Sequence, residues 1–198
     1  MRFYAPLFRD AMAGNFWKFR MAIDMYQSGF FQQSHWKARF FLWTAALESL
    51  FTSQSRGGQH SGSMVAKERV KFLLGATTPV YPPGEFMDLD PDPGLTVADV
   101  IDEIYCLRNH TAHGDKLPDL YYEAAGRPDF QGSSVVKGEM LLEAISSIIR
   151  QCLLKILKEN LIHHFADATS SEAYFTASNL TKAELKKAYP NYSHACPQ

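Results

Sequence analysis

The segment RNHTAHG, residues 108–114, closes a predicted helix and places an arginine and a histidine five positions apart. At 100° per residue, one arc of this helix is apolar, and Arg108 falls near the middle of that arc. The arc consists of Val97, Val100, Ile101, Ile104, Tyr105 and Leu107. A guanidinium cannot lose its charge, so on an apolar face it must be paired or line a cleft. We therefore expect Arg108 to have a specific partner or ligand.

Two more charged residues lie on apolar helix faces. Residues 40–51 are apolar almost all the way round the helix, yet they include Glu48. In the next helix, residues 63–74, Arg69 lies within the apolar face. Because buried charges are usually paired, we expect Glu48 to contact an arginine, with Arg69 as the first choice and Arg108 as the second. The structural alternative is a buried salt bridge that only fixes the register of the helices.

The residue types in the 108–114 segment can carry out acid–base chemistry beside a fixed positive charge. His113 can act as an acid or base near neutral pH, and Arg108 is a permanent cation with planar donors that suit an anionic group. Asn109 can hold an oxygen of such a group or orient His113. Five residues along a helix, however, separate Arg108 from His113 by about 140°. Either the helix ends before His113, as Gly114 indicates, or two copies of the segment face each other across a dimer.

Helical periodicity accounts for the elements that must position these residues, and no segment has the alternation of a strand. We predict main helices at about 7–28, 34–51, 63–74, 96–113 and 135–163, then short helices at about 169–178 and 181–189. Gly29, Gly75 and Gly114 are expected to end helices. Capping pairs are expected at Thr96 with Asp99 and at Thr181 with Glu184. The sequence predicts an all-α antiparallel helical bundle of about five main helices.

The composition indicates one globular domain. The chain has 198 residues, 46% of them hydrophobic, so residues 1–165 can form the bundle and 166–198 a short helical extension of the same domain. Lys and Arg number 20 against 21 Asp and Glu. No overall positive field therefore attracts nucleic acid, and RNA binding would need a local patch or a groove shared between subunits.

The cysteines and the amino terminus indicate a cytoplasmic protein. Cys106, Cys152 and Cys196 have no CxxC spacing, and the first two lie in helical patterns. This is typical of reduced thiols, so we expect no disulfide. The amino terminus has no apolar leader, and no uncharged apolar stretch reaches the roughly 18 residues that span a bilayer. We expect no metal or other cofactor, since His110 and His113 lack further ligands at a convincing spacing.

Three sequence elements form a recognisable series: ALESLF at 46–51, KERVKFLLG at 67–75 and IYCLRNHTAHG at 104–114, followed by a long closing helix. Together they resemble the HEPN superfamily, in particular its Apea-like branch, and the resemblance covers roughly residues 42–161. It implies an all-helical bundle that is frequently a homodimer. In active members it implies a metal-independent endoribonuclease, whose catalytic arginine, polar residue and histidine would here be Arg108, Asn109 and His113.

Further expectations follow from this resemblance. Glu48, Arg69, Tyr105 and His110 would support the three catalytic positions. Single-stranded RNA would be the substrate, and an antitoxin or operon partner would control an activity associated with phage defence, abortive infection or toxin systems. The alternative is a noncatalytic nucleic-acid or protein interaction module, in which His113 only caps the helix.

Overall fold

The computed structural model describes residues 9, 16–31, 36–52, 62–80, 95–113 and 138–189, without the side chains at 111–113, 138–140 and 182. These residues are mostly helical. Their one β-type pairing is an isolated bridge between Pro79 and Thr96. The predicted all-α fold is therefore confirmed.

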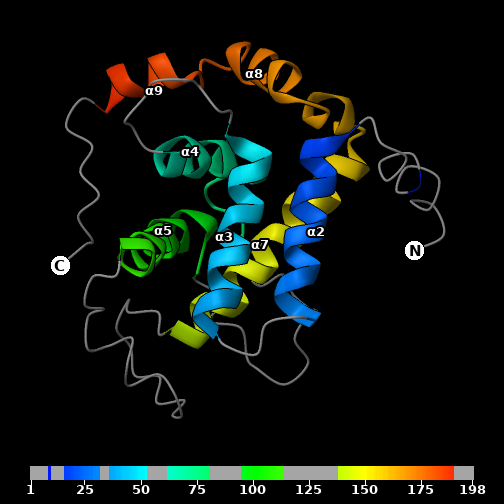
Figure 1. Cartoon of the computed structure of the whole chain (residues 1–198). Helices are drawn as coiled ribbons and strands as arrows, with labels where there is room; N and C mark the ends of the chain where they lie inside the picture. Colours follow the sequence, from blue (N-terminus) through cyan, green and yellow to red (C-terminus); the bar gives the residue numbers. More distant parts are fainter. Residues whose placement is uncertain are drawn as a thin grey trace.

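Five main helices form the bundle, as predicted. They are α2 (Trp17–Phe31), α3 (Trp36–Phe51), α4 (Gly62–Leu74), α5 (Val97–His113) and α7 (Gly138–Lys158). Helices α2 and α3 lie side by side, and α4 and α5 lie on the other side of α3 (Figure 1). Both α3 and α7 pack against each of the other main helices, so the predicted central position of α7 is shared with α3.

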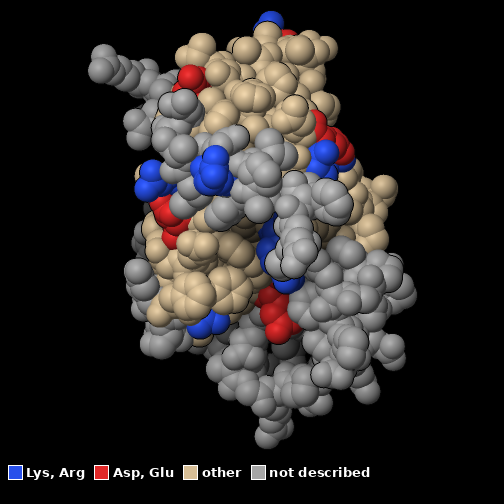
Figure 2. Space-filling model, turned by 90° about the vertical axis from the view of Figure 1, so that its right-hand side faces the viewer, with Lys and Arg blue, Asp and Glu red and all other residues tan. Residues whose placement is uncertain are grey.

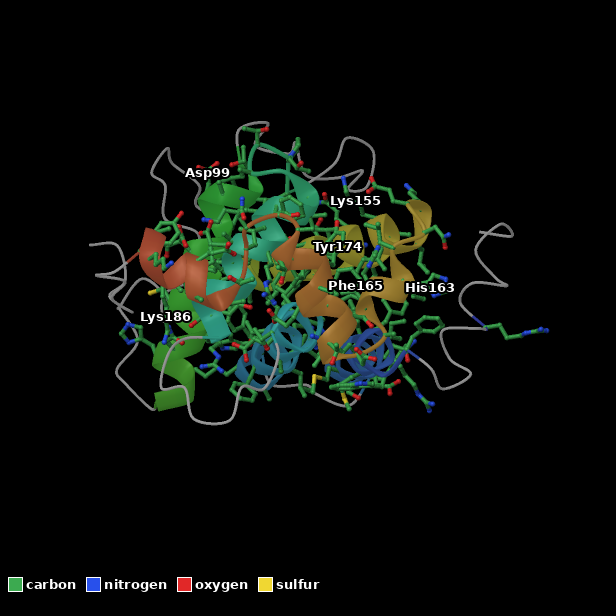
Figure 3. All side chains as sticks on the ribbon, turned by 90° about the horizontal axis from the view of Figure 1, so that it is seen from above. Asp99, Lys155, His163, Phe165, Tyr174 and Lys186 are labelled. Atoms are coloured by element: carbon green, nitrogen blue, oxygen red, sulfur yellow. The ribbon has the colours of Figure 1, made fainter. Side chains whose placement is uncertain are left out.

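Three short elements follow α7: the 3₁₀ helix η3 (Ile162–Phe165), then α8 (Ala168–Thr176) and α9 (Lys182–Ala188). Helices α8 and α9 lie across one end of the bundle (Figure 1). Seen from above, Phe165 of η3 and Tyr174 of α8 are neighbours, and their ring centroids are 6.0 Å apart (Figure 3). This end of the bundle is therefore closed by aromatic packing.

The two central helices supply much of the core. The predicted apolar stripe of α7 is buried, and α3 buries side chains around most of its circumference. The α3 residues are Phe40, Trp43, Ala46, Leu47, Leu50 and Phe51, and the α7 stripe is Leu141, Ile145, Ile148, Cys152 and Ile156. Glu48, in the last turn of α3, is 22% exposed, and a partner offsets the cost of its partial burial.

The helix end predicted at Gly29 is wrong, because α2 continues to Phe31. A Cβ atom at Gly29 would lie 2.2 Å from Nε1 of Trp43 on α3. The same Nε1 donates a 2.9 Å hydrogen bond to the carbonyl of Tyr26. Gly29 therefore permits close packing between two helices and does not end one.

The long closing helix ends at Lys158 and not at the predicted His163. Asn160 adopts a positive φ of 55°, and the amide of Leu161 donates to the carbonyl of Ile156 over 2.8 Å. This bond satisfies a carbonyl at the helix end, in the manner usually provided by glycine. Gly75, at φ +94°, ends α4 as predicted, whereas Gly114 lies outside the described residues.

Both predicted capping pairs are confirmed. Thr96 and Asp99 exchange hydrogen bonds at the start of α5, where the Thr96 amide donates to Asp99 Oδ2 over 2.9 Å. Thr181 and Glu184 form a complete capping box at the start of α9. These local bonds explain why α5 and α9 begin where the sequence indicates.

The expectation of no disulfide is wrong. Cys106 on α5 is disulfide-bonded, to a partner outside the described residues, while Cys152 is a free, buried thiol whose pKa is raised by burial. A disulfide requires that two Cβ atoms approach to about 4 Å in the fold. The spacing of cysteines along the sequence therefore indicates only disulfides between neighbouring residues and cannot exclude one between distant residues. None of the described helices has the length and apolar content needed to cross a bilayer.

Candidate functional site

An ion pair joins α3 to α5. Arg108 Nη2 lies 3.2 Å from Oε2 of Glu48, which is in the last turn of α3. The prediction that Glu48 contacts an arginine is confirmed, with the second choice, Arg108, as the partner. The first choice, Arg69, is wrong.

The prediction that Arg108 lies near the middle of the apolar face is wrong, because its side chain is 24% exposed whereas the apolar residues of that face are buried. Besides the bond to Glu48, its Nη1 donates to Oδ1 of Asn109 over 3.4 Å. The guanidinium carbon lies 6.0 Å from the centre of the Phe41 ring. Arginine has five N–H donors, so within the described part of the chain two are used and three remain. The guanidinium is held in place and can still bind an anion.

The carboxylate of Glu48 is only half satisfied. Its Oε1 is buried and accepts no hydrogen bond from any described residue. Burial raises the pKa of Glu48, and the attraction and hydrogen bond of Arg108 oppose that rise. Buried acceptors without a donor are rare in folded proteins and need an explanation such as a functional role.

In Arg69, in contrast, every N–H group of the guanidinium donates a hydrogen bond. It is fully buried, and its five N–H groups donate to both carboxylate oxygens of Glu172, to the Phe51 carbonyl and twice to the Leu180 carbonyl. Its guanidinium carbon also lies 4.3 Å from the centre of the Phe175 ring. Arg69 therefore fastens α8 and the residues before α9 to the bundle. The structure does not bring it to the Glu48 and Arg108 pair.

Lys18 is a second buried cation beside Arg69. It is 1% exposed, and its Nζ donates to the Thr52 carbonyl over 2.8 Å, one residue beyond the Phe51 carbonyl that Arg69 binds. Two cations thus satisfy the carbonyl end of α3. Burial, and then repulsion from Arg69, lowers the pKa of Lys18 to about 8.

Helix α5 continues through His113, so the alternative that it ends before this residue is wrong. Positions 108 and 113 are therefore about 140° apart around one helix axis. The side chain of His113 lies outside the described residues, as do those of Thr111 and Ala112. Of the two arrangements considered from the sequence, the dimer is the one still open.

The remaining predicted residues are on α5. Asn109 is 9% exposed and contacts Arg108 as given above. Tyr105 is 1% exposed and belongs to the hydrophobic core, and His110 is half-buried. The structure therefore brings Glu48, Arg108 and Asn109 together.

The described residues contain no group of three or more His, Cys, Asp or Glu side chains that could hold a metal ion. His163 lies on the opposite side of the molecule from α5 and so cannot join His110 in a metal site (Figure 3). On the face shown in Figure 2, basic and acidic side chains of the described residues lie in small mixed groups and form no single positive patch. This agrees with the nearly neutral composition.

Sequence reasoning missed Phe41, Lys18 and Glu172. Phe41 belongs to a run of apolar residues, and only the fold shows that it is 43% exposed beside Arg108. Glu172 lies 103 positions from Arg69, beyond the reach of a helical pattern. Its spacing from Phe175 on α8 was the one local signal that it faces the bundle.

No protein-family model, curated protein or solved structure matches this chain. The function must therefore be inferred from the residues themselves.

Proposed function

We propose that the protein is a metal-independent endoribonuclease of the HEPN type that cleaves single-stranded RNA as a homodimer. The observation that carries the proposal is the state of Arg108. It is a partly exposed guanidinium, held by Glu48, with three N–H donors left among the described residues. The buried Arg69 has the same chemistry and no donor left, which separates the structural arginine from the functional one.

The chemistry follows from these groups. The 2′-hydroxyl oxygen attacks the adjacent phosphorus, a base accepts its proton, and the 5′ oxygen leaves with a proton. The products are a 2′,3′-cyclic phosphate and a 5′-hydroxyl. Arg108 stabilises the charge that develops on the phosphate oxygens, Asn109 holds the guanidinium or a phosphate oxygen, and His113 exchanges the protons. Glu48 is a positioning residue, since it holds Arg108 by Nη2.

A dimer makes this arrangement possible. Because positions 108 and 113 diverge around α5, the proposed site takes Arg108 from one subunit and His113 from the other. Two equivalent sites would form across a two-fold axis. The interface would include α5, and both copies of the segment would face a shared groove.

The proposal is tested with labelled single-stranded RNA in the presence of EDTA. The wild-type protein should cleave the RNA and leave a 2′,3′-cyclic phosphate. Arg108→Ala should lower the rate on the order of a hundredfold to a thousandfold, the usual cost of one oriented donor. Arg108→Lys should restore little, because an ammonium lacks the planar pair of donors. Arg20→Ala is the matched control, since Arg20 is an exposed α2 arginine paired with Asp24 and should leave the rate unchanged.

Two results would contradict the proposed ribonuclease activity. Cleavage that survives Arg108→Ala would move the chemistry away from this site. RNA binding without cleavage by the wild-type dimer would leave the noncatalytic interaction module as the function. In the proposed setting the enzyme acts in phage defence or a toxin system, under an antitoxin or operon partner.

A further inference from the structure

Phe41 is an exposed aromatic ring on a helix that is otherwise mostly buried. Its side chain is 43% exposed, whereas its neighbour Phe40 is fully buried. The ring centre lies 6.0 Å from the guanidinium carbon of Arg108, at the limit for a cation–π contact. An exposed phenylalanine alone needs no explanation, but this one adjoins a cation with unused donors.

Three side chains follow one stripe of α3 past this cation. Phe41 and Glu48 are seven positions apart, which places them within about 20° of each other around the helix. Lys37 comes one turn before Phe41, about 6 Å along the axis. Arg108 reaches this stripe from α5, since it contacts both Glu48 and Phe41. The order along the stripe is cation, aromatic ring, cation and carboxylate.

We propose that Phe41 stacks on the nucleobase next to the phosphate that Arg108 holds, so that RNA lies along this stripe of α3. The inference rests on the proposed function, and it names the part of the substrate that the site recognises. A phosphate on the open donors of Arg108 brings the base of its own nucleotide within reach of the Phe41 ring. Lys37, whose Nζ lies 5.6 Å from the centre of the Trp36 ring, adds a positive charge one turn before Phe41.

This arrangement matches how proteins bind single-stranded nucleic acid. Such sites combine cations that follow the backbone with aromatic rings on which bases stack. Every base presents a π-face, so Phe41 should demand a base without selecting which one.

The test compares two ligands and two protein variants. The ligands are fluorescein-labelled oligouridylate of twelve nucleotides and an abasic ribose-phosphate chain of the same length. All proteins carry His113→Ala, so that the RNA survives the titration, and affinity is read from fluorescence anisotropy. Phe41→Leu keeps an apolar side chain without a ring, and Phe41→Trp restores a ring. Phe72→Leu is the matched control, because Phe72 is 45% exposed on α4 and packs instead on Tyr174 and Phe175.

Phe41→Leu should weaken oligouridylate binding by about 10- to 100-fold, the usual cost of losing one stacked base. It should not weaken binding of the abasic chain, which has no base to stack. Phe41→Trp should bind as tightly as the parent, and Phe72→Leu should change neither ligand. A purely structural role for Phe41 would instead weaken both ligands equally.

Each other outcome is decisive. If Phe41→Leu binds oligouridylate as the parent does while Arg108→Ala abolishes cleavage, the stacking role is wrong and the ribonuclease stands. If Phe41→Leu dissociates the dimer, seen by light scattering, and leaves affinity per subunit unchanged, the ring belongs to an interface between copies. If neither ligand binds and Arg108→Ala leaves the cleavage rate unchanged, the proposed ribonuclease function is wrong, and the stacking role of Phe41 is wrong with it.

Discussion

Removing the acidic partner of Arg69 should lower the free energy of unfolding far more than removing the acidic partner of Arg108. Glu172→Ala would leave Arg69 fully buried with two of its five hydrogen bonds gone. A charge-assisted bond contributes about 1.5 to 3 kcal/mol, and breaking one side of a buried ion pair costs about 3 to 5 kcal/mol. We therefore expect Glu172→Ala to lower the free energy of unfolding by about 3 to 5 kcal/mol.

Glu48→Ala should cost far less. Arg108 is 24% exposed and can be hydrated when its partner is removed, and the substitution also deletes the unsatisfied Oε1. A partly exposed pair contributes about 0 to 1 kcal/mol, so we expect a loss within that range. Activity should show the opposite order, because Glu48 positions Arg108 and Glu172 does not.

Urea unfolding followed by circular dichroism at 222 nm measures both losses, provided that the slope with denaturant is unchanged. Glu172→Gln is the control, because its amide oxygen can still accept one hydrogen bond from Arg69, so it should lose less stability than Glu172→Ala. Equal losses for Glu172→Ala and Glu48→Ala would refute the distinction between a structural and a functional arginine.

Three further predictions follow from buried groups. The pKa of Lys18 is lowered to about 8 in the folded protein, so between about pH 8 and 10.5 the unfolded protein binds this proton and the folded protein does not. The free energy of unfolding should therefore rise over this pH range, by up to about 3 kcal/mol. Urea unfolding at a series of pH values measures the rise, and Lys18→Met should abolish it. Gly29→Ala should destabilise by about 1 to 3 kcal/mol in the same assay, because its Cβ would lie 2.2 Å from Trp43 Nε1, whereas Gly62→Ala, at 3.5 Å from its nearest neighbour, should be tolerated. Thiol titration of the denatured, unreduced protein should find one of the three cysteines free, and finding three would contradict the disulfide at Cys106.

Local patterns predicted most of the bundle. The apolar spacing of α3, α4 and α5 and the capping pairs Thr96–Asp99 and Thr181–Glu184 concern residues within a few turns, so the sequence contains the whole signal. The same periodicity placed Arg69 and Glu48 on inner faces. It could not choose between two arginines for Glu48, because both satisfy the same rule.

The errors arise where distant parts of the chain decide. Gly29 has the properties of a helix end, but the indole of Trp43 requires a glycine there. Asn160 follows the end of α7 with a positive φ, a conformation that glycine usually adopts, so no glycine in the sequence marked this helix end. The partner of Arg69 depends on where α8 lies over the bundle, and the bond at Cys106 depends on contacts that no spacing records.

Mixing two inactive variants tests the shared site most directly. Arg108→Ala and His113→Ala proteins are each expected to be inactive, and they are mixed under conditions that exchange subunits. Half of the dimers are then mixed, and each mixed dimer has one site with both residues intact, so the mixture should recover about a quarter of the wild-type cleavage rate. A mixture that forms mixed dimers, shown by light scattering of differently tagged subunits, and still cleaves no RNA would contradict a site built from Arg108 and His113 of different subunits.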